Sequence, residues 1–235
     1  MLDESKSEIV MSGLPATGKT TVAKGLAEVL EIRTINTDQI RDAILKKGTR
    51  ADVDNCQTDE ERMKYDLQEI LDPFFDRYPS IVPKYQPKIS EQKETIIYPE
   101  FFKTAERLLI KYGGVILDAT FTKRKWRLEA YELARKHRKS FYLIYCVCPE
   151  EVIRKRLEGR RRGNIGVSEV TTMKVYNIVK SGLENPLDDG VSTLVYDSSI
   201  PHPSLRNGGI KFAHREKWNS KGLDALAKSL CSIVV

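Results

Sequence analysis

One stretch of the sequence has residue types and spacing suited to binding phosphate groups. It has the pattern G-x-x-x-x-G-K-[ST], and it lies between an apolar run at residues 8–12 and a segment with helical spacing at residues 20–31. Glycines allow a loop in which successive backbone N–H groups face a phosphate, and the positive end of a following helix favours the negative charge. This context makes a chance glycine turn a poor explanation. The residues of this phosphate-binding loop (P-loop) are Gly13, Leu14, Pro15, Ala16, Thr17, Gly18, Lys19 and Thr20.

The last two residues of the P-loop have separate expected roles. Lys19 is expected to place its charge on the β- and γ-phosphates of a nucleoside triphosphate and so to be catalytic. The hydroxyl of Thr20 is expected to ligate Mg²⁺. The sequence therefore predicts ATP and Mg²⁺ as cofactors of a phosphoryl transfer. The motif itself does not distinguish ATP from GTP.

A carboxylate and a guanidinium lie at the start of the helix that follows the second predicted strand, residues 32–36. Asp38 and Arg41 are three positions apart, so they share one helical face and are expected at the carboxyl edge of the sheet. A carboxylate there can take the proton of an attacking hydroxyl, and the arginine can hold an anionic substrate. Spacing alone supports equally well an ordinary N-cap aspartate followed by an exposed arginine.

A second carboxylate ends a buried strand. Asp118 follows the continuous apolar run at residues 115–117, where a carboxylate can orient a metal-bound water or an acceptor hydroxyl. Asp118 is therefore a candidate for both metal and substrate binding. Its alternative role is to cap the turn that carries Thr120 and Thr122. The position after a buried strand in a chain with a P-loop favours the functional interpretation.

Basic residues crowd the end of one helix and the glycine turn that follows it. Like charges at this density repel one another unless an anion is present, so the cluster is a candidate lid that closes over the nucleotide phosphates. For any single member, a solvated position on the surface is an equally good interpretation. The cluster contains Arg154, Lys155, Arg156, Arg160, Arg161 and Arg162.

A second basic region, residues 123–127 with residues 135–139, could contact a nucleic-acid backbone, with Trp126 available for base stacking. The favoured interpretation is one charged helix whose Trp126 packs inward. The whole chain has 39 Lys and Arg against 33 Asp and Glu, a net charge of +6, which is a weak indication of a polyanionic partner such as RNA or DNA.

The order of predicted elements is mostly strand then helix. Further strands are expected at residues 141–147 and 192–196, and further helices at residues 98–112, 125–139, 168–183 and 223–233. This order predicts a three-layer α/β fold, a parallel sheet flanked by helices with ligands at the carboxyl ends of the strands. We expect a single domain over residues 1–235. It would carry a helical and proline-rich insertion at about 49–97, an arginine-rich lid at about 156–168, and an irregular segment and helix at 198–235.

Composition sets broad limits on the protein's class. Hydrophobic residues make up 40% and charged residues 31% of the 235 residues, as in soluble globular proteins. Apolar runs fall well short of the ~20 residues needed to cross a bilayer, so we expect a cytoplasmic protein without a membrane partner. The four cysteines have spacings that favour core packing over a metal site or a disulfide. Nothing in the sequence indicates the oligomeric state.

These motifs together resemble the polynucleotide kinase and zeta-toxin branch of P-loop kinases, a group of AAA_33-type predicted kinases. The resemblance covers most of the chain and rests on residues 13–20, 35–41, 114–120 with Arg127 downstream, and 161–163. It implies that Asp38 is the general base on a 5′-hydroxyl, that Arg41 binds a substrate phosphate, and that Arg162 is a lid residue that reaches the nucleotide. It also implies a parallel sheet with the P-loop strand near its centre.

The leading functional hypothesis is an ATP-dependent kinase that phosphorylates a polynucleotide 5′-hydroxyl, on RNA or DNA. The same residues would serve a small-molecule, nucleotide-sugar or seryl-tRNA kinase, and the acceptor would be chosen by the insertion at 49–97. A hypothesis of a different class is a nucleotide-dependent switch ATPase that binds RNA or a protein. Asp38 argues against a switch, which has no need of a base on the acceptor side.

Overall fold

A computed structural model describes residues 7–45, 96–161, 170–200, 210–213 and 228. The chain divides into two compact units. The first consists of Met1–Ile35 and Leu108–Val235, and the second consists of Asn36–Arg107. Within the described ranges, no helix is both long and apolar enough to cross a membrane.

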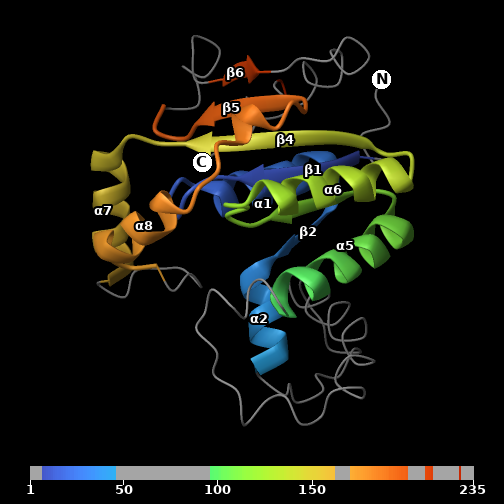
Figure 1. The fold of residues 1–235 in the computed structure, drawn as a ribbon, viewed down its shortest axis with the longest axis horizontal. Coiled ribbons are helices and arrows are strands. Elements are labelled where there is room, and N and C mark those ends of the chain that lie inside the picture. The colour runs from blue at the N-terminus through green and yellow to red at the C-terminus, as the bar shows by residue number, and fades with distance from the viewer. Residues whose placement is uncertain (1–6, 46–95, 162–169, 201–209, 214–227, 229–235) are drawn as a thin grey trace. The chain divides into compact units, whose positions relative to one another are not determined.

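The first unit is built on a six-stranded sheet with the strand order β2-β3-β1-β4-β5-β6 (Figure 1). The strands are β1 (Ser7–Ser12), β2 (Arg33–Asn36), β3 (Val115–Asp118), β4 (Ser140–Val147), β5 (Thr193–Asp197) and β6 (Ile210–Ala213). Strand β1 pairs in parallel with β3 and β4, and β5 pairs in parallel with β4. The prediction of a parallel sheet with the P-loop strand near its centre is confirmed.

The last strand was not expected from the sequence. Strand β6 pairs with β5 in antiparallel orientation, with Ile210 opposite Tyr196 and Ala213 opposite Thr193. It lies in the stretch after residue 198 that was predicted to be irregular before a final helix, so that prediction is wrong for residues 210–213. The predicted helix at 223–233 falls almost entirely outside the described residues.

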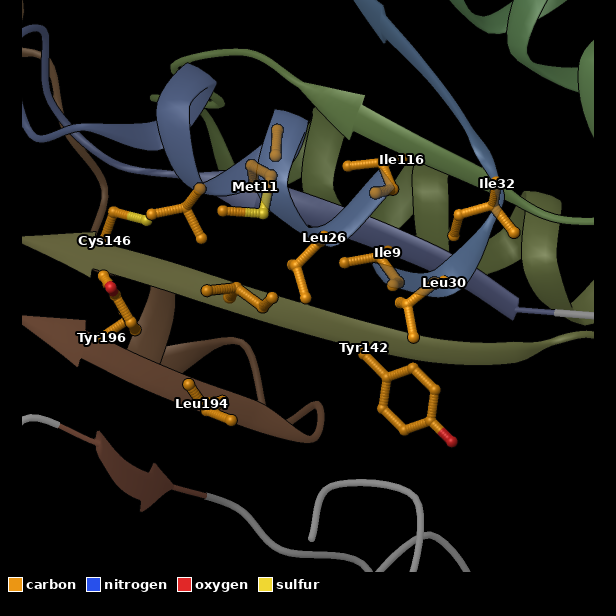
Figure 2. Close-up of a cluster of buried hydrophobic side chains, with 13 residues drawn as sticks. Ile9, Met11, Leu26, Leu30, Ile32, Ile116, Tyr142, Cys146, Leu194 and Tyr196 are labelled. Atoms are coloured by element: carbon orange, nitrogen blue, oxygen red, sulfur yellow. The ribbon is translucent and has the colours of Figure 1, made fainter. Parts of the chain in front are cut away.

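Helix α1 (Lys19–Leu30) covers one face of the sheet. Because side chains alternate along a strand, Ile9 and Met11 of β1 point to the same face, where they pack with Leu26 and Leu30 of α1. Figure 2 shows this cluster between α1 and the central strands. The apolar spacing of α1 is therefore what brings the P-loop, which precedes this helix, against the carboxyl end of β1.

Helix α6 (Arg124–Lys136) packs against β1 and β4 with buried side chains that include Ala130, Leu133 and Ala134. None of them belongs to the cluster under α1. The two helices thus lie on opposite faces, which gives the predicted three layers. Coverage of both faces explains why the central strands are continuous apolar runs.

Helices α7 (Glu150–Arg161) and α8 (Met173–Ser181) pack around the P-loop. Ile153 and Leu157 of α7 and Tyr176 of α8 form a buried cluster with Leu14 and Ala16 of the loop. Helix α8 begins later than the predicted residue 168, because Thr172 is its N-cap and accepts a hydrogen bond from the backbone N–H of Val175 at 3.4 Å. A short 3-10 helix, η4 (Pro186–Asp188), follows.

The described part of the second unit contains helix α2 (Thr37–Leu45) and the beginning of helix α5 (Tyr98–Tyr112), whose bounds agree with the prediction. The rings of Tyr98, Phe101 and Phe102 pack together, with Phe101 and Phe102 edge to face at 5.7 Å between centroids. Residues 46–95, which include nearly all of the predicted insertion, lie outside the described residues.

Candidate nucleotide-binding site

The P-loop backbone adopts a conformation that requires glycine at its first position. Gly13 has a φ angle of 144°, and a Cβ atom at this residue would lie 2.4 Å from the carbonyl oxygen of Cys146. The backbone N–H of Gly13 donates to the carbonyl of Thr120 at 3.2 Å. Gly18, in the left-handed region with φ of 84°, is the N-cap of α1. The loop therefore leads directly into the positive end of a helix, where an anion is favoured.

The side chain of Lys19 is folded back over the loop. It is 8% exposed, and its Nζ donates to the carbonyl of Leu14 at 2.8 Å. The hydroxyl of Thr17 donates to the same carbonyl at 2.8 Å. The ammonium group of Lys19 is therefore held against the loop backbone, and its action on nucleotide phosphates stays a prediction.

The charges near the loop also act on a neighbouring buried thiol. Burial raises the pKa of Cys146 to about 12, with Lys19 lowering it and Asp118 raising it as weaker contributions. The ammonium and the carboxylate thus act on the same buried volume at the carboxyl end of β4. At neutral pH this thiol is protonated, so its role is packing and not nucleophilic chemistry.

Two residues predicted from separate motifs meet in the structure. The Thr20 hydroxyl donates to Oδ2 of Asp118 at 2.6 Å. The meeting follows from the sheet, since Asp118 is in register with Met11 on the neighbouring strand β1. Asp118 is 3% exposed. A hydroxyl and a carboxylate are oxygen ligands of the type that Mg²⁺ prefers, so the pair fits the predicted metal.

One member of the arginine cluster binds the P-loop from outside. Arg156 of α7 donates from Nη1 to the carbonyl of Ala16 and to the hydroxyl of Ser198, each at 3.0 Å. Its Nη2 donates to the carbonyl of Ser198, also at 3.0 Å. Ser198, which follows β5, was not singled out from the sequence. Arg156 therefore fastens the P-loop to the turn after β5.

The other described members of the cluster lie elsewhere. Arg154 is exposed and lies 3.6 Å from Glu150 on the same helix, which agrees with a solvated position. Arg160 donates to the carbonyl of Val170 at 3.4 Å. Arg162 lies outside the described residues, so its role as a lid residue stays a prediction.

In the second unit, Asp38 and Arg41 contact each other. Nη1 of Arg41 lies 3.1 Å from Oδ1 of Asp38. The N-cap of α2 is Asn36, whose Oδ1 accepts from the backbone N–H of Gln39 at 2.7 Å while its own N–H donates to Gln39 at 3.1 Å. This is the reciprocal arrangement of a capping box. The alternative of an N-cap aspartate with an exposed arginine is therefore wrong, because another residue caps the helix and Arg41 is buried, at 6% exposure.

The basic residues at the start of α6 have acidic partners from a distant segment. Nζ of Lys123 lies 3.2 Å from Glu184, and Nε of Arg124 lies 3.6 Å from Asp189. The guanidinium of Arg127 binds both carboxylate oxygens of Asp189, and both side chains are fully buried. These contacts favour the interpretation of this region as part of the folded structure over a nucleic-acid contact. No sequence pattern pointed to Glu184 or Asp189.

Comparisons with known proteins bear on this geometry. Residues 9–186 match the AAA_33 family, described as an AAA domain. No curated protein sequence matches the chain. Among solved structures, the chain is similar to a gluconokinase from Sinorhizobium meliloti 1021, with a TM-score of 0.50, 18% identity and coverage of 96% of this chain and 95% of that one. It is also similar to Kti12 from Chaetomium thermophilum in complex with ADP-AlF3, with a TM-score of 0.52, 17% identity and coverage of 85% of this chain and 94% of that one.

The two kinds of comparison support different conclusions. At 17–18% identity the solved structures show a shared fold alone. The family match spans more than half of the chain and includes both the P-loop and Asp118. The chain therefore belongs to the AAA_33 family and has the fold of a P-loop kinase, a nucleotide-binding and phosphotransferase fold.

Proposed function

We propose that this protein transfers the γ-phosphoryl group of ATP to a hydroxyl group, with a polynucleotide 5′-hydroxyl as the acceptor. The observation that carries the proposal is the pair formed by Asp38 and Arg41. Asp38 is not used as a helix cap, its side chain is 31% exposed, and a buried guanidinium holds it at 3.1 Å. A partly exposed and oriented carboxylate is what a base acting on an acceptor hydroxyl needs.

The P-loop residues supply the other half of the reaction. Lys19 would neutralise charge on the β- and γ-phosphates, while Thr20 and Asp118 would hold Mg²⁺, which adds its own charge to that neutralisation when bound. Phosphoryl transfer depends on positioning and electrostatic stabilisation more than on covalent participation by the protein. Fixed, mostly buried groups such as these suit that requirement.

A small-molecule acceptor is the main alternative for the same catalytic residues. The similarity to a structure named as a gluconokinase is compatible with it, although that similarity concerns the fold. The basic residues 123, 124 and 127 are bound to carboxylates within the protein, so they add no support to a nucleic-acid acceptor. The polynucleotide assignment rests on the Asp38–Arg41 pair and the family resemblance.

The test is transfer of label from γ-labelled ATP to 5′-hydroxyl oligonucleotides, tRNA and a panel of sugars and sugar acids. We expect the wild-type protein to label an oligonucleotide and Asp38→Asn to lower that rate by ~10² to 10⁴, because the amide keeps the size but not the proton-accepting charge. Asp188→Asn, the same change at an exposed carboxylate of the first unit, is the control and should be silent.

The two parts of the proposal can fail separately. If only a small molecule is labelled and the labelling depends on Asp38, the proposed kinase activity stands but the polynucleotide acceptor is rejected. Transfer by Asp38→Asn at the wild-type rate would reject Asp38 as the base. Hydrolysis of ATP without transfer to any acceptor would favour the switch ATPase.

A further inference from the structure

The loop of residues 119–123 connects the predicted metal ligand Asp118, at the end of β3, to helix α6. Its first half is hydrogen-bonded to the end of β1 and the start of the P-loop. The carbonyl of Thr120 accepts from the Gly13 N–H at 3.2 Å and from the Ser12 hydroxyl at 3.4 Å. The N–H of Ala119 donates to the carbonyl of Met11 at 3.4 Å. Any shift of this loop is therefore passed to Asp118 and to the first residues of the P-loop.

The second half of the loop has a backbone conformation that needs support. Phe121 has a φ angle of 46° and a fully buried ring. Positive φ is uncommon for a bulky residue other than glycine. Its carbonyl accepts from Nη1 of Arg127 at 2.6 Å. Nη1 of Arg127 therefore holds the carbonyl of Phe121, the residue with the unusual backbone conformation.

Arg127 is itself fixed by the segment at residues 184–189. Its Nη2 donates to Oδ1 of Asp189 at 2.9 Å, and Nε donates to the other carboxylate oxygen, so the planar group cannot rotate. The same segment also holds the loop directly, since the N–H of Glu184 donates to the carbonyl of Thr122 at 2.8 Å. The Glu184 carboxylate accepts from the N–H of Arg124 at 2.6 Å and so caps the first turn of α6.

We propose that Arg127, held by Asp189, is a positioning residue that sets the place of Asp118 beside Thr20 and thereby the affinity of the site for Mg²⁺-bound nucleotide. Arg127 itself touches neither nucleotide nor metal in this assignment. A fully buried ion pair is poor evidence for a role in stability alone, because the cost of desolvating its charges can exceed their attraction. What the pair provides, and an apolar pair would not, is a directed donor to the carbonyl of Phe121. The inference rests on the proposed use of Mg²⁺ and ATP.

The test replaces the ion pair by apolar side chains, Arg127→Met together with Asp189→Leu, which avoids leaving one buried charge unpaired. Calorimetric titration gives the dissociation constant for ATP in excess Mg²⁺ and in EDTA. We expect Mg²⁺ to tighten ATP binding by the wild-type protein. In the double variant the Mg²⁺-dependent gain in ATP affinity should be smaller by about ten- to a hundred-fold, the usual effect of removing groups that orient a metal ligand. The dissociation constant measured in EDTA should change little.

Two further variants separate positioning from general stability. Leu133→Ala removes a buried side chain of the same helix and leaves all the contacts of Arg127 in place, so it should lower stability without changing the Mg²⁺-dependent gain. Glu184→Ala removes a half-exposed carboxylate and should reduce the gain in the same direction as the double variant, by a smaller factor. It decides the question if the double variant does not fold.

The inference fails if the folded double variant keeps the wild-type Mg²⁺-dependent gain in ATP affinity, or if Leu133→Ala loses as much of that gain as the double variant does. It also fails if the double variant does not fold and Glu184→Ala has no effect on the gain. It also fails if ATP binding by the wild-type protein does not depend on Mg²⁺. The absence of any phosphorylated acceptor would refute the proposed function but leaves this measurement intact, because binding is measured without turnover.

Discussion

Strand β1 differs at its two ends in whether buried polar groups have hydrogen-bond partners. At the carboxyl end, the Ser12 hydroxyl and the Gly13 N–H both donate to the carbonyl of Thr120. At the amino end, Glu8 is fully buried, and neither of its carboxylate oxygens has a hydrogen-bond partner among the described residues. Its neighbours in register are Val115 and Phe141, both buried and apolar.

Because of this difference, we assign the carboxyl end of β1 to the candidate site and the amino end to the core. A buried polar group costs free energy unless it is hydrogen-bonded, so the partners at the carboxyl end keep polar groups in place where a ligand is expected. At the amino end, burial raises the pKa of Glu8 well above its usual value. The carboxyl of Glu8 therefore remains protonated to a higher pH than an exposed glutamate, and it behaves as a weakly polar core residue.

The largest effect is expected at the carboxyl end, from Lys19→Met. The substitution keeps an unbranched side chain of similar length but removes the charge from a residue that is only 8% exposed. We expect transfer of the γ-phosphoryl group to fall by ~10³ or more for every acceptor, because the lost charge acts on the phosphates and not on acceptor choice. Steady-state kinetics with labelled ATP measures the loss.

Lys24→Met is the matched control, since Lys24 is an exposed residue of the same helix. It should leave the rate within about twofold, as is usual for changes at exposed charges. Turnover by Lys19→Met close to that of Lys24→Met would reject the assignment of the P-loop lysine.

A second prediction concerns the close packing of β1 against β4 at this end. Gly13→Ala would place a Cβ atom 2.4 Å from the Cys146 carbonyl, at a φ angle of 144° that other residues rarely adopt. We expect the free energy of unfolding to fall by about 2–4 kcal/mol, from strain and overpacking together. Urea denaturation of the variant and the wild-type protein measures this difference.

Gly190→Ala separates strain from packing. Gly190 also has a positive φ, 76°, but an added Cβ would meet no atom within 4 Å. Its substitution should cost only about 1 kcal/mol, the price of the left-handed conformation. Equal losses in the two variants would show that the contact with Cys146 relaxes freely and that the carboxyl end is less tightly packed than we infer.

The features that the sequence predicted well are encoded locally. The P-loop is a run of eight residues whose glycines and lysine have fixed offsets. Strands β3 and β4, which lie on either side of β1 in the sheet, are continuous apolar runs. Asp118 could be linked to the site because it ends such a strand, and parallel strands next to each other bring their carboxyl ends together. Its contact with Thr20 follows from that topology.

The features that the sequence did not reveal depend on pairings between distant segments or on very short patterns. Arg127 belongs to the motifs behind the family resemblance, but its partner Asp189 lies 62 positions away and alone looks like an ordinary surface charge. Strand β6 has only four residues and lacks the continuous apolar run that marks the equally short β3. The sequence could not place the cap of α2, because Asn36, Thr37 and Asp38 are all good N-cap residues and only hydrogen bonds distinguish them.

The sharpest test of the comparison is expected from Glu8→Gln. In the unfolded chain Glu8 loses its proton near the ordinary value for glutamate, whereas in the folded protein its pKa is raised well above that value by burial. Below the ordinary value the carboxyl is protonated in both states, so its titration does not change the stability with pH. As pH rises above it, the unfolded chain releases the proton first, so wild-type stability falls until the folded pKa is passed.

One proton of linkage corresponds to about 1.4 kcal/mol per pH unit, so Glu8→Gln should become progressively more stable relative to the wild-type protein as the pH rises above about 5. Urea denaturation at a series of pH values gives the difference directly, because titrations elsewhere in the chain are common to both proteins. Glu28→Gln, an exposed change on α1, should show no such trend. Parallel stability curves for Glu8→Gln and the wild-type protein would mean that Glu8 is ionised and has found a partner. The amino end of β1 would then resemble the carboxyl end, and the contrast between core and site would fail.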